Sequence, residues 1–302
     1  MKHVFIAVFS LSLSCRLDVA SQSTTDTNQA VDTQNNTDTQ SNDTSEPDET
    51  DNHNTDTTTV SDASPGCGEV NPNPDTSLPI EGKSRSFVLS IPNDYNPNQA
   101  YPLVFAWHGR GGSGSIAKSY FGLTGPMGDD AIVVYPNGVP QWSVGGDTGW
   151  DLNPNGDDFD FFDAMLEHLA DSLCVDTSRV FSTGHSFGGY MSNTLGCFRG
   201  DVHNAIAPVA GGPYGSIACP DEVGVWLTHG FADSVVWLSE GLSALYIWQQ
   251  ANGCSSTSSD TDPSPCVAFD GCSRDVHWCE HTGGHEWPSF AGAAIWDFFS
   301  AQ

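Results

Sequence analysis

The sequence predicts an α/β fold, with a mostly parallel central sheet and helices on both of its faces. Short apolar runs alternate along the chain with stretches of helical spacing, as in sheets whose parallel strands are joined by helices. One run, residues 101–107 (YPLVFAW), is almost continuously apolar, which is typical of a central strand buried on both faces. The part of the chain with this alternation, residues 66–302, has about 237 residues and can form one domain with a large core.

The first half of this domain contains three predicted strands and one long helix. Residues 86–91 (SFVLSI) alternate apolar and polar side chains with a period of two, as a half-buried strand does. Residues 101–107 and 131–135 (AIVVY) are short apolar runs and are predicted to be buried strands. Residues 158–174 place apolar side chains three or four positions apart, which predicts a helix with one buried face.

The second half of the domain continues the alternation. The predicted strands cover residues 179–183, 205–209, 223–228 and 276–279. The predicted helices cover residues 189–197, 238–250 and 289–299. Because sites in such sheets lie beyond the carboxyl ends of the strands, the residues that follow each strand are the candidates for function.

The residues before 66 are expected to lie outside the folded domain. Residues 1–20 are typical of a secretory signal peptide, with Lys2 followed by an apolar run too short to span a bilayer. Cys15 follows this run as in a bacterial lipoprotein processing site, although Ser12 stands where that pattern prefers leucine, so lipid anchoring and plain secretion both remain open. Residues 21–65 carry ten acidic residues and no Lys or Arg, which predicts a disordered tether. The sequence thus predicts a secreted or cell-surface protein.

The domain is strongly acidic. Of 38 acidic and nine basic residues in the chain, 27 and seven fall in residues 66–302, a formal charge of −20. Such a surface repels nucleic acid, so we expect no nucleic-acid partner. We expect the protein to be a monomer.

Eight cysteines follow Cys15, an even number. In an exported domain this count predicts up to four disulfides, whose pairing the sequence does not determine. A zinc site is the alternative, but no C-x-x-C pair is present. The eight are Cys67, Cys174, Cys197, Cys219, Cys254, Cys266, Cys272 and Cys279.

The predicted strand 179–183 leads into GHSFG and then into a predicted helix. This is the G-x-S-x-G nucleophile elbow in its strand–turn–helix setting, which makes Ser186 the candidate nucleophile. Gly184 and Gly188 fit this turn because a side chain there would strike the neighbouring strand or helix. The N–H groups at the start of the following helix favour developing negative charge.

A serine nucleophile needs a base, and the base needs an orienting acid. In this architecture the acid and then the histidine follow the serine along the chain. Asp233 lies in the loop after the predicted strand 223–228, and His285 follows two glycines after strand 276–279. We assign Asp233 as acid and His285 as base, with His281 as the weaker alternative base.

The tetrahedral intermediate of acyl transfer needs N–H donors for its oxyanion. One predicted donor is the backbone of Phe187, which follows the nucleophile. The other should come from residues 108–114 (HGRGGSG), since four glycines let backbone amides approach a ligand. A phosphate-binding loop is the competing reading, but its lysine is absent; a flexible surface loop is the other alternative.

Several residues near the predicted strand ends are expected to contact a substrate. They are His108, Gly109, Trp150, His185 and Trp287. The tryptophans, and Trp142 with them, could stack on a planar ring or could be ordinary packing residues.

No cofactor or metal is expected. Asp157, Asp158 and Asp160 resemble a calcium-binding cluster, but carboxylates at a helix start explain them without a metal.

Taken together, the motifs resemble one enzyme group. WHGRGGSG, YPNG, GWD, DDFDFFDAM, RVFSTGHSFGGYMS, HGFAD and GGHEWP, spread over residues 82–300, are similar to the secreted feruloyl esterase and poly(3-hydroxybutyrate) depolymerase group, which includes acetylxylan esterases of carbohydrate esterase family 1. The resemblance implies an α/β-hydrolase fold and supports Ser186, Asp233 and His285 as the triad. It also implies that Arg110 supplies the second oxyanion N–H. Arg110 and Phe187 depart from the group, where many members have cysteine and asparagine.

The resemblance implies a serine carboxylesterase. Feruloyl esters of plant cell-wall polysaccharide are the favoured substrate, so the expected partner is a polysaccharide-linked or polymeric ester. Poly(3-hydroxybutyrate) and acetylxylan are the alternatives, and a peptidase is a further one. A non-catalytic carbohydrate-binding surface protein is an alternative of another class, which an intact triad argues against.

Overall fold

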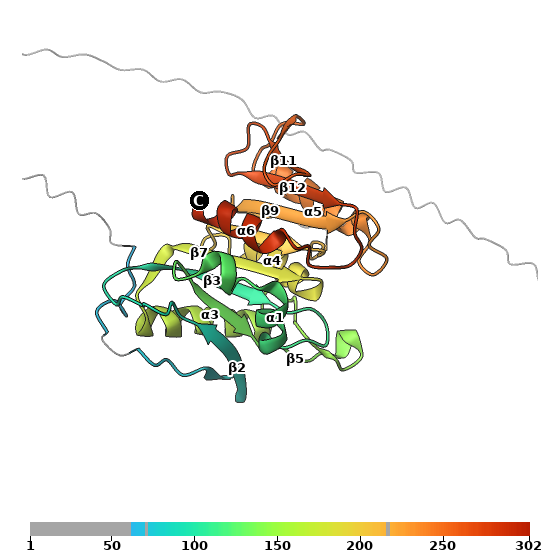
Figure 1. Ribbon diagram of the computed structural model, residues 1–302. Coiled ribbons are helices and arrows are strands. Elements are labelled where there is room, and N and C mark those ends of the chain that lie inside the picture. The colour runs from blue at the N-terminus through green and yellow to red at the C-terminus, as the bar shows by residue number, and fades with distance from the viewer. Residues whose placement is uncertain (1–61, 70–71, 216–217) are drawn as a thin grey trace, which may run out of the picture. The chain divides into compact units, whose positions relative to one another are not determined.

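The computed structural model describes residues 62–69, 72–215 and 218–302 (Figure 1). The predicted signal peptide, Cys15 and tether residues 21–61 lie outside these residues. Residues 62–65, which the sequence assigns to the tether, instead contact the domain. Ser64 is buried, donates a hydrogen bond to the Leu173 carbonyl (2.6 Å) and accepts one from the Val175 N–H (2.9 Å).

The structure confirms the predicted fold class. A ten-stranded sheet has the order β1-β2-β4-β3-β7-β8-β9-β12-β11-β10, and its central strands from β4 to β12 pair in parallel. The end strands pair antiparallel. The strands are β1 (Ser77–Ile80), β2 (Lys83–Ser90), β3 (Tyr101–Trp107), β4 (Ile132–Pro136), β7 (Val175–His185), β8 (Ala205–Val209), β9 (Gly224–Gly230), β10 (Ser258–Asp260), β11 (Cys266–Phe269) and β12 (Val276–His281).

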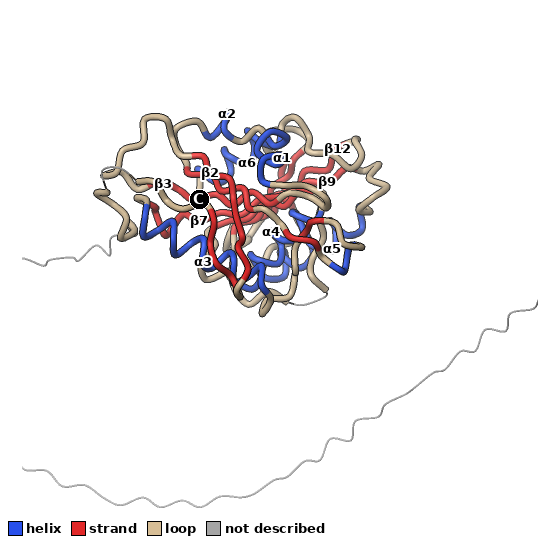
Figure 2. Tube along the Cα trace, turned by 90° about the horizontal axis from the view of Figure 1, so that it is seen from below, coloured by secondary structure: helices blue, strands red, loops and turns tan. Residues whose placement is uncertain are grey.

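Helices cover both faces of the sheet, as Figure 2 shows. Apolar side chains of α1, α2 and α6 pack on one face, and those of α3, α4 and α5 pack on the other. The helices are α1 (Gly114–Phe121), α2 (Thr124–Met127), α3 (Asp157–Ser172), α4 (Phe187–Phe198), α5 (Leu238–Ala251) and α6 (Ala291–Ser300). A small hairpin of β5 (Val139–Pro140) and β6 (Thr148–Gly149), with the 3-10 helix η1 (Trp142–Val144) between them, follows β4.

The end of β7 and the start of α4, on either side of Ser186, differ from the predicted boundaries. β7 runs from Val175 to His185, longer than the predicted 179–183, because its pairing with β8 continues as far as His185 opposite Val209. α4 begins at Phe187 rather than at 189, and the Tyr190 N–H already bonds to the Ser186 carbonyl (3.1 Å). Ser186 is therefore the single residue between strand and helix.

All eight cysteines of the domain form disulfides, which confirms the expected number. This leaves no thiolate among them for the zinc alternative. Such bridges are typical of proteins that fold in an oxidising compartment. The pairs are Cys67–Cys174, Cys197–Cys219, Cys254–Cys272 and Cys266–Cys279. Within the ranges that the structure describes, no helix is long and apolar enough to cross a membrane.

Candidate active site

Ser186 has the strained backbone of a nucleophile elbow. Its φ is 58° and its ψ is −119°, a conformation that residues with a side chain rarely adopt. The turn is fixed from both sides: the Ser186 N–H donates to the Val209 carbonyl of β8 (3.0 Å), and the Ser186 carbonyl accepts from Tyr190. Ser186 thus stands at the carboxyl edge of the sheet, in the turn that exposes the nucleophile of such elbows.

The glycines around Ser186 let three backbone segments meet. A Cβ on Gly184 would lie 2.5 Å from the Gly188 carbonyl oxygen, and one on Gly188 would collide with the Trp107 carbonyl of β3. A Cβ on Gly189 would lie 2.7 Å from the Val209 carbonyl oxygen. These close approaches are the physical reason for the glycine pattern of the motif.

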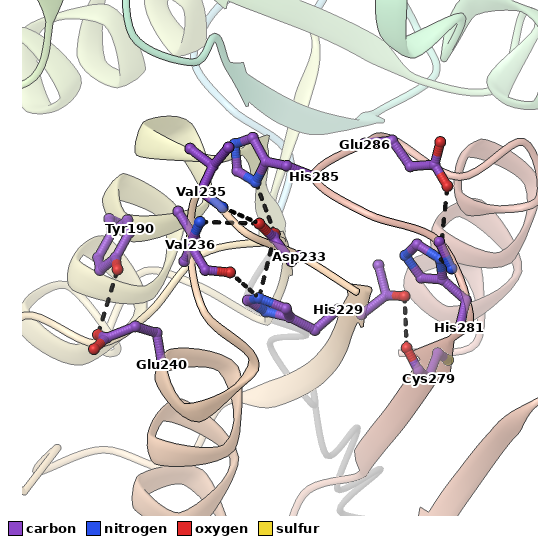
Figure 3. Close-up of polar contacts among 12 residues, drawn as sticks. Tyr190, His229, Asp233, Val235, Val236, Glu240, Cys279, His281, His285 and Glu286 are labelled. Carbon is purple, nitrogen blue, oxygen red and sulfur yellow. Dashed lines mark hydrogen bonds and ion pairs between the residues drawn. The ribbon is translucent and has the colours of Figure 1, made fainter. Parts of the chain in front are cut away.

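Asp233 and His285 form a hydrogen-bonded pair, shown in Figure 3. His285 Nδ1 lies 2.7 Å from Asp233 Oδ2, and Asp233 Oδ1 accepts the N–H groups of Val235 and Val236, both at 2.9 Å. Burial alone would raise the pKa of Asp233, but the hydrogen bonds from His285 and from these two amides outweigh it and hold the pKa below its usual range. Asp233 is thus an ionised acceptor that orients the His285 ring.

Main-chain hydrogen bonds bring these two residues together. β9 and β12 are parallel neighbours, and Gly230 pairs with His281 at their carboxyl ends. Beyond the strands, the Phe231 N–H donates to the His281 carbonyl (2.7 Å) and the Ala232 N–H to the Gly283 carbonyl (3.0 Å). The loops that carry Asp233 and His285 therefore run side by side.

His281, the alternative base, does not contact Asp233. It is the last residue of β12, and its Nδ1 accepts the Gly283 N–H (3.2 Å) and lies 3.9 Å from Glu286 Oε1. Figure 3 shows its contact with Glu286 and none with Asp233. The geometry therefore favours His285 over His281 as the base.

The three candidate residues lie at the same edge of the sheet, where each follows the carboxyl end of a parallel strand. The ring of His285 lies 4.7 Å, centre to centre, from that of His185, the residue before Ser186. Among the described residues, no hydrogen bond joins Ser186 Oγ to His285. Hydrogen bonds of this kind are often open in ligand-free enzymes and close when substrate binds.

The loop of residues 108–114 packs directly on Ser186. A Cβ on Gly109 would lie 3.4 Å from Ser186 Cβ and 3.9 Å from its Oγ. The N–H groups of Arg110 and Phe187 donate no hydrogen bond to any described residue. Phe187 also begins α4, where helix N–H groups are unpaired and favour negative charge. Both amides are thus available to an oxyanion beside Ser186.

His108 and Trp150, two predicted substrate contacts, are almost fully buried, although His108 still lines a hollow described below. Both are 1% exposed. Nε2 of His108 accepts the Gly138 N–H (2.9 Å) while Nδ1 donates to the Gly109 carbonyl (2.7 Å), and burial lowers the pKa of His108. Trp150 Nε1 donates to the His108 carbonyl (2.8 Å). These two side chains hold the loop of residues 108–114 from the interior of the domain.

Trp287 and His185 are also largely buried. Trp287 stacks on Phe121 with ring centres 4.1 Å apart, and its N–H donates to Tyr120 Oη (2.9 Å), so it packs α1 against the His285 loop. His185 borders the site, and burial, followed by the neighbouring His285, lowers its pKa to about 3. His185 is therefore neutral at ordinary pH. Trp142, by contrast, is 95% exposed on the β5–β6 hairpin.

A hollow of about 170 Å³ is lined by His185, the residue before Ser186, and by part of the loop 108–114. Gly109, Arg110 and His185 line one side, and Ile116 and Tyr120 of α1 line the other. Sequence reasoning missed α1 because residues 114–121 are too few to show a period. Its two caps are the signal that could have identified it, since Ser113 accepts the Ile116 N–H at the start and Gly122 ends the helix in the left-handed conformation.

Two of the three carboxylates considered for calcium contact cations of the protein instead. Asp157 lies 2.7 Å from Lys83 Nζ, and Asp158 pairs with Arg85. No group of three or more His, Cys, Asp or Glu side chains among the described residues could hold a metal ion.

Comparison with known proteins identifies the family. Residues 145–212, which include Ser186, match the prolyl oligopeptidase family. The chain is 34% identical to feruloyl esterase D of Neurospora crassa over 252 residues, 73% of this chain and 83% of that protein. It is also 34% identical to feruloyl esterase C of Emericella nidulans over 256 residues, 79% of this chain and 91% of that protein.

Solved structures share the fold at lower identity. An acetyl xylan esterase from Aspergillus awamori superposes with a TM-score of 0.59 at 16% identity, covering 77% of this chain and 99% of that one. A ferulic acid esterase of carbohydrate esterase family 1 from Anaeromyces mucronatus gives 0.52 at 16% identity, covering 76% and 90%. The chain belongs to the feruloyl esterase family and is a serine hydrolase of carboxylic esters with the α/β-hydrolase fold.

Proposed function

We propose that this protein is a secreted feruloyl esterase that hydrolyses hydroxycinnamoyl esters of plant cell-wall polysaccharide. The observation that carries the proposal is the 2.7 Å hydrogen bond between His285 and Asp233 at the sheet edge where the strained Ser186 stands. The feruloyl esterases of Neurospora crassa and Emericella nidulans, its relatives at 34% identity, support the substrate class.

The chemistry follows from the tautomer of His285. With Nδ1–H donated to Asp233, Nε2 carries a lone pair and accepts the Ser186 proton as Oγ attacks the ester carbonyl. The protonated His285 then donates to the leaving alcohol, which leaves an acyl group on Ser186. Water, deprotonated by His285, hydrolyses this acyl-enzyme and restores the serine.

The negative charge of each tetrahedral intermediate falls on the former carbonyl oxygen. The Arg110 and Phe187 amides are the proposed donors to it, because they are unpaired and flank Ser186. The Arg110 guanidinium is not needed for this role. It is exposed and paired with Asp147, at 2.8 Å between Nε and Oδ2.

The hollow lined by His185 and the loop 108–114 favours an aromatic acyl group over an acetyl group. Ile116 and Tyr120 give it an apolar wall that an acetyl group would leave mostly uncovered. Acetylxylan and poly(3-hydroxybutyrate) are the alternative substrates. The charge of −20 on residues 66–302 favours an uncharged polymer over an anionic one and disfavours nucleic acid.

We place the enzyme outside the cytoplasm. The signal-like residues 1–20 and the four disulfides support export, and Cys15 offers a site for lipid attachment. In this proposal the enzyme acts as a monomer.

The test combines active-site labelling with a substrate panel on the full chain. A fluorophosphonate probe should label the wild type and not Ser186→Ala, and turnover of methyl ferulate should fall by about 10⁴ or more in that variant. The control is Ser243→Ala, because within the described part of the chain the Ser243 hydroxyl bonds only to the Ser239 carbonyl of its own helix. Equal labelling of wild type and Ser186→Ala would reject Ser186 as the nucleophile, and no labelling of the wild type would support the non-catalytic binding protein instead.

The panel compares methyl ferulate, acetylated xylan and poly(3-hydroxybutyrate). The proposal expects the highest kcat/KM for methyl ferulate. A higher value for either of the other two would replace feruloyl esters as the substrate class and leave the triad in place.

A further inference from the structure

A buried ion pair lies outside the candidate triad. Arg85 of β2 and Asp158, the second residue of α3, are 2% and 0% exposed, and Arg85 Nη2 lies 2.5 Å from Asp158 Oδ1. The guanidinium also lies over the ring of Phe161, 4.4 Å from its centre. Burying two charges costs more than packing apolar residues of similar size, so this pair is not explained by stability alone.

The remaining hydrogen bonds of the pair all reach one segment of the chain. We call residues 137–151, which connect β4 to the turn before α3, the strap. Asp158 Oδ2 accepts the Asp151 N–H (2.5 Å) and the Gln141 side-chain amide (3.4 Å). Arg85 Nη2 donates to the Asn137 carbonyl (3.2 Å). The ion pair therefore holds the strap at both ends and near its hairpin.

The strap in turn holds the loop that carries the Arg110 amide. Among the described residues, every hydrogen bond that residues 108–114 make outside themselves and α1 goes to the strap. These bonds are Gly111 N–H to Thr148 carbonyl (2.8 Å), Thr148 Oγ1 to Gly112 carbonyl (2.8 Å), Trp150 Nε1 to His108 carbonyl (2.8 Å), Gly138 N–H to His108 Nε2 (2.9 Å), Gly114 N–H to Asn137 Oδ1 (2.8 Å) and Arg110 Nε to Asp147 Oδ2 (2.8 Å).

We propose that Arg85 and Asp158 are positioning residues that set the oxyanion hole through the strap. The inference rests on the proposed function, because it needs the Arg110 amide to bind the oxyanion. A shift of the strap would move that amide relative to Ser186, whereas Ile116 and Tyr120, which give the hollow its apolar wall, have no hydrogen bond to the strap among the described residues. A change in either residue of the pair would thus raise the free energy of the transition state more than it weakens substrate binding.

The first experiment replaces one charge without changing shape. Asp158→Asn should lower kcat for methyl ferulate about 10- to 100-fold while KM stays within about twofold. Phenylboronic acid, which forms a tetrahedral adduct with the serine, should bind more weakly by a similar factor. Inhibition by ferulic acid, which does not use the oxyanion donors in this way, should be unchanged.

The chain supplies a matched control next to the pair. Lys83 and Asp157 join the same strand and the same helix start by an ion pair of 2.7 Å, but their side chains are 67% and 41% exposed. Lys83→Gln and Asp157→Asn should leave kcat and phenylboronic acid affinity within about twofold of wild type, since surface ion pairs contribute little. Equal losses in the control and in Asp158→Asn would overturn the proposal.

A second variant covers the case in which Asp158→Asn does not fold. Thr148→Val keeps the side-chain shape and removes only the hydrogen bond to the Gly112 carbonyl. It should lower kcat and phenylboronic acid affinity together, by about 3- to 10-fold, with KM unchanged. Wild-type values in folded Thr148→Val would overturn the proposal, and so would wild-type values in folded Asp158→Asn.

Failure of this inference differs from failure of the proposed function. If Ser186→Ala loses turnover while Asp158→Asn and Thr148→Val keep it, only the positioning role is wrong. If Ser186→Ala keeps turnover, the proposed function itself is wrong.

Discussion

The two sides of the active site are held in different ways. On the acid–base side, backbone hydrogen bonds from Phe231 and Ala232 join the loops that carry Asp233 and His285. On the oxyanion side, residues 108–114 depend largely on side chains, including Thr148 and Trp150. On the acid–base side, the backbone pairing of adjacent parallel strands is enough to bring the two loops together. On the oxyanion side, particular side chains such as Thr148 and Trp150 must stand at particular positions. Activity should therefore be sensitive to backbone crowding on the acid–base side and to the loss of single polar groups on the oxyanion side.

The largest effect is expected at the acid. Asp233→Asn should lower kcat for methyl ferulate about 10⁴-fold, because an amide can donate to Nδ1 of His285 and hold the wrong tautomer. Steady-state kinetics and the rate of fluorophosphonate labelling would measure the loss. Activity within tenfold of wild type would show that Asp233 does not orient the base.

The second-largest loss of activity is expected from backbone crowding on the acid–base side. A Cβ on Gly230 would collide with the Gly284 carbonyl and lie 2.5 Å from the Gly283 carbonyl oxygen, so Gly230→Ala should push apart the loops of Asp233 and His285. We expect about a 100-fold loss of kcat and a decrease of about 1–3 kcal/mol in the free energy of unfolding.

Gly284→Ala is the control for this variant. The nearest atom to a Cβ there is the Ala232 carbonyl oxygen at 3.7 Å, so kcat should stay within about twofold. Similar kinetics for both alanine variants would contradict the crowding argument.

A smaller effect is expected from one side chain of the oxyanion side. Trp150→Phe removes the donor to the His108 carbonyl and should lower the free energy of unfolding by about 1–3 kcal/mol, with a few-fold loss of kcat. Trp142→Phe, at a side chain that is 95% exposed, should change stability by less than about 0.5 kcal/mol. Chemical denaturation would compare them, and equal stabilities would show that Trp150 does not hold the loop.

The smallest effect on turnover is expected from His203, which belongs to neither side. It is buried at the turn between α4 and β8, where burial lowers its pKa to about 4. Its side chain therefore takes up a proton on unfolding between about pH 6.5 and pH 4, so stability is fully present above this window and falls as pH decreases through it.

His203→Gln should leave kcat unchanged and reduce the slope of unfolding free energy against pH by up to about 1.4 kcal/mol per pH unit in that window. Denaturation at pH 7 and pH 4.5 would measure it. The same slope in the variant and the wild type would assign the acid sensitivity to other groups, His185 among them.

The sequence predicted the acid–base side better than the oxyanion side. A strand-end position is enough to place Asp233 beside His285, since β9 and β12 are neighbours in the sheet. His108 and Trp150 also follow strands or loops at this edge, but nothing in the sequence shows that they point inward. Their direction depends on the strap, whose two-residue strands have no hydrophobic period.

Edge elements were missed for a related reason. β10 is three exposed residues, SSD, and pairs only with β11, so no apolar pattern marks it. α6 begins at Ala291 without a side-chain cap, two residues after the predicted start at 289. The central strands at residues 101–107 and 131–135, by contrast, are continuous apolar runs, and this property identifies them in the sequence.

The entry of the chain into the domain has a mechanical consequence. Ser64 and the Cys67–Cys174 disulfide fasten residues 62–67 to the amino end of β7, and Ser186 follows the carboxyl end of that same strand. An eleven-residue strand extends about 35 Å, so a pull transmitted through the preceding residues is borne at the far end of the sheet from the reacting serine. The place where the chain enters the domain and the reacting serine therefore lie at opposite ends of one strand.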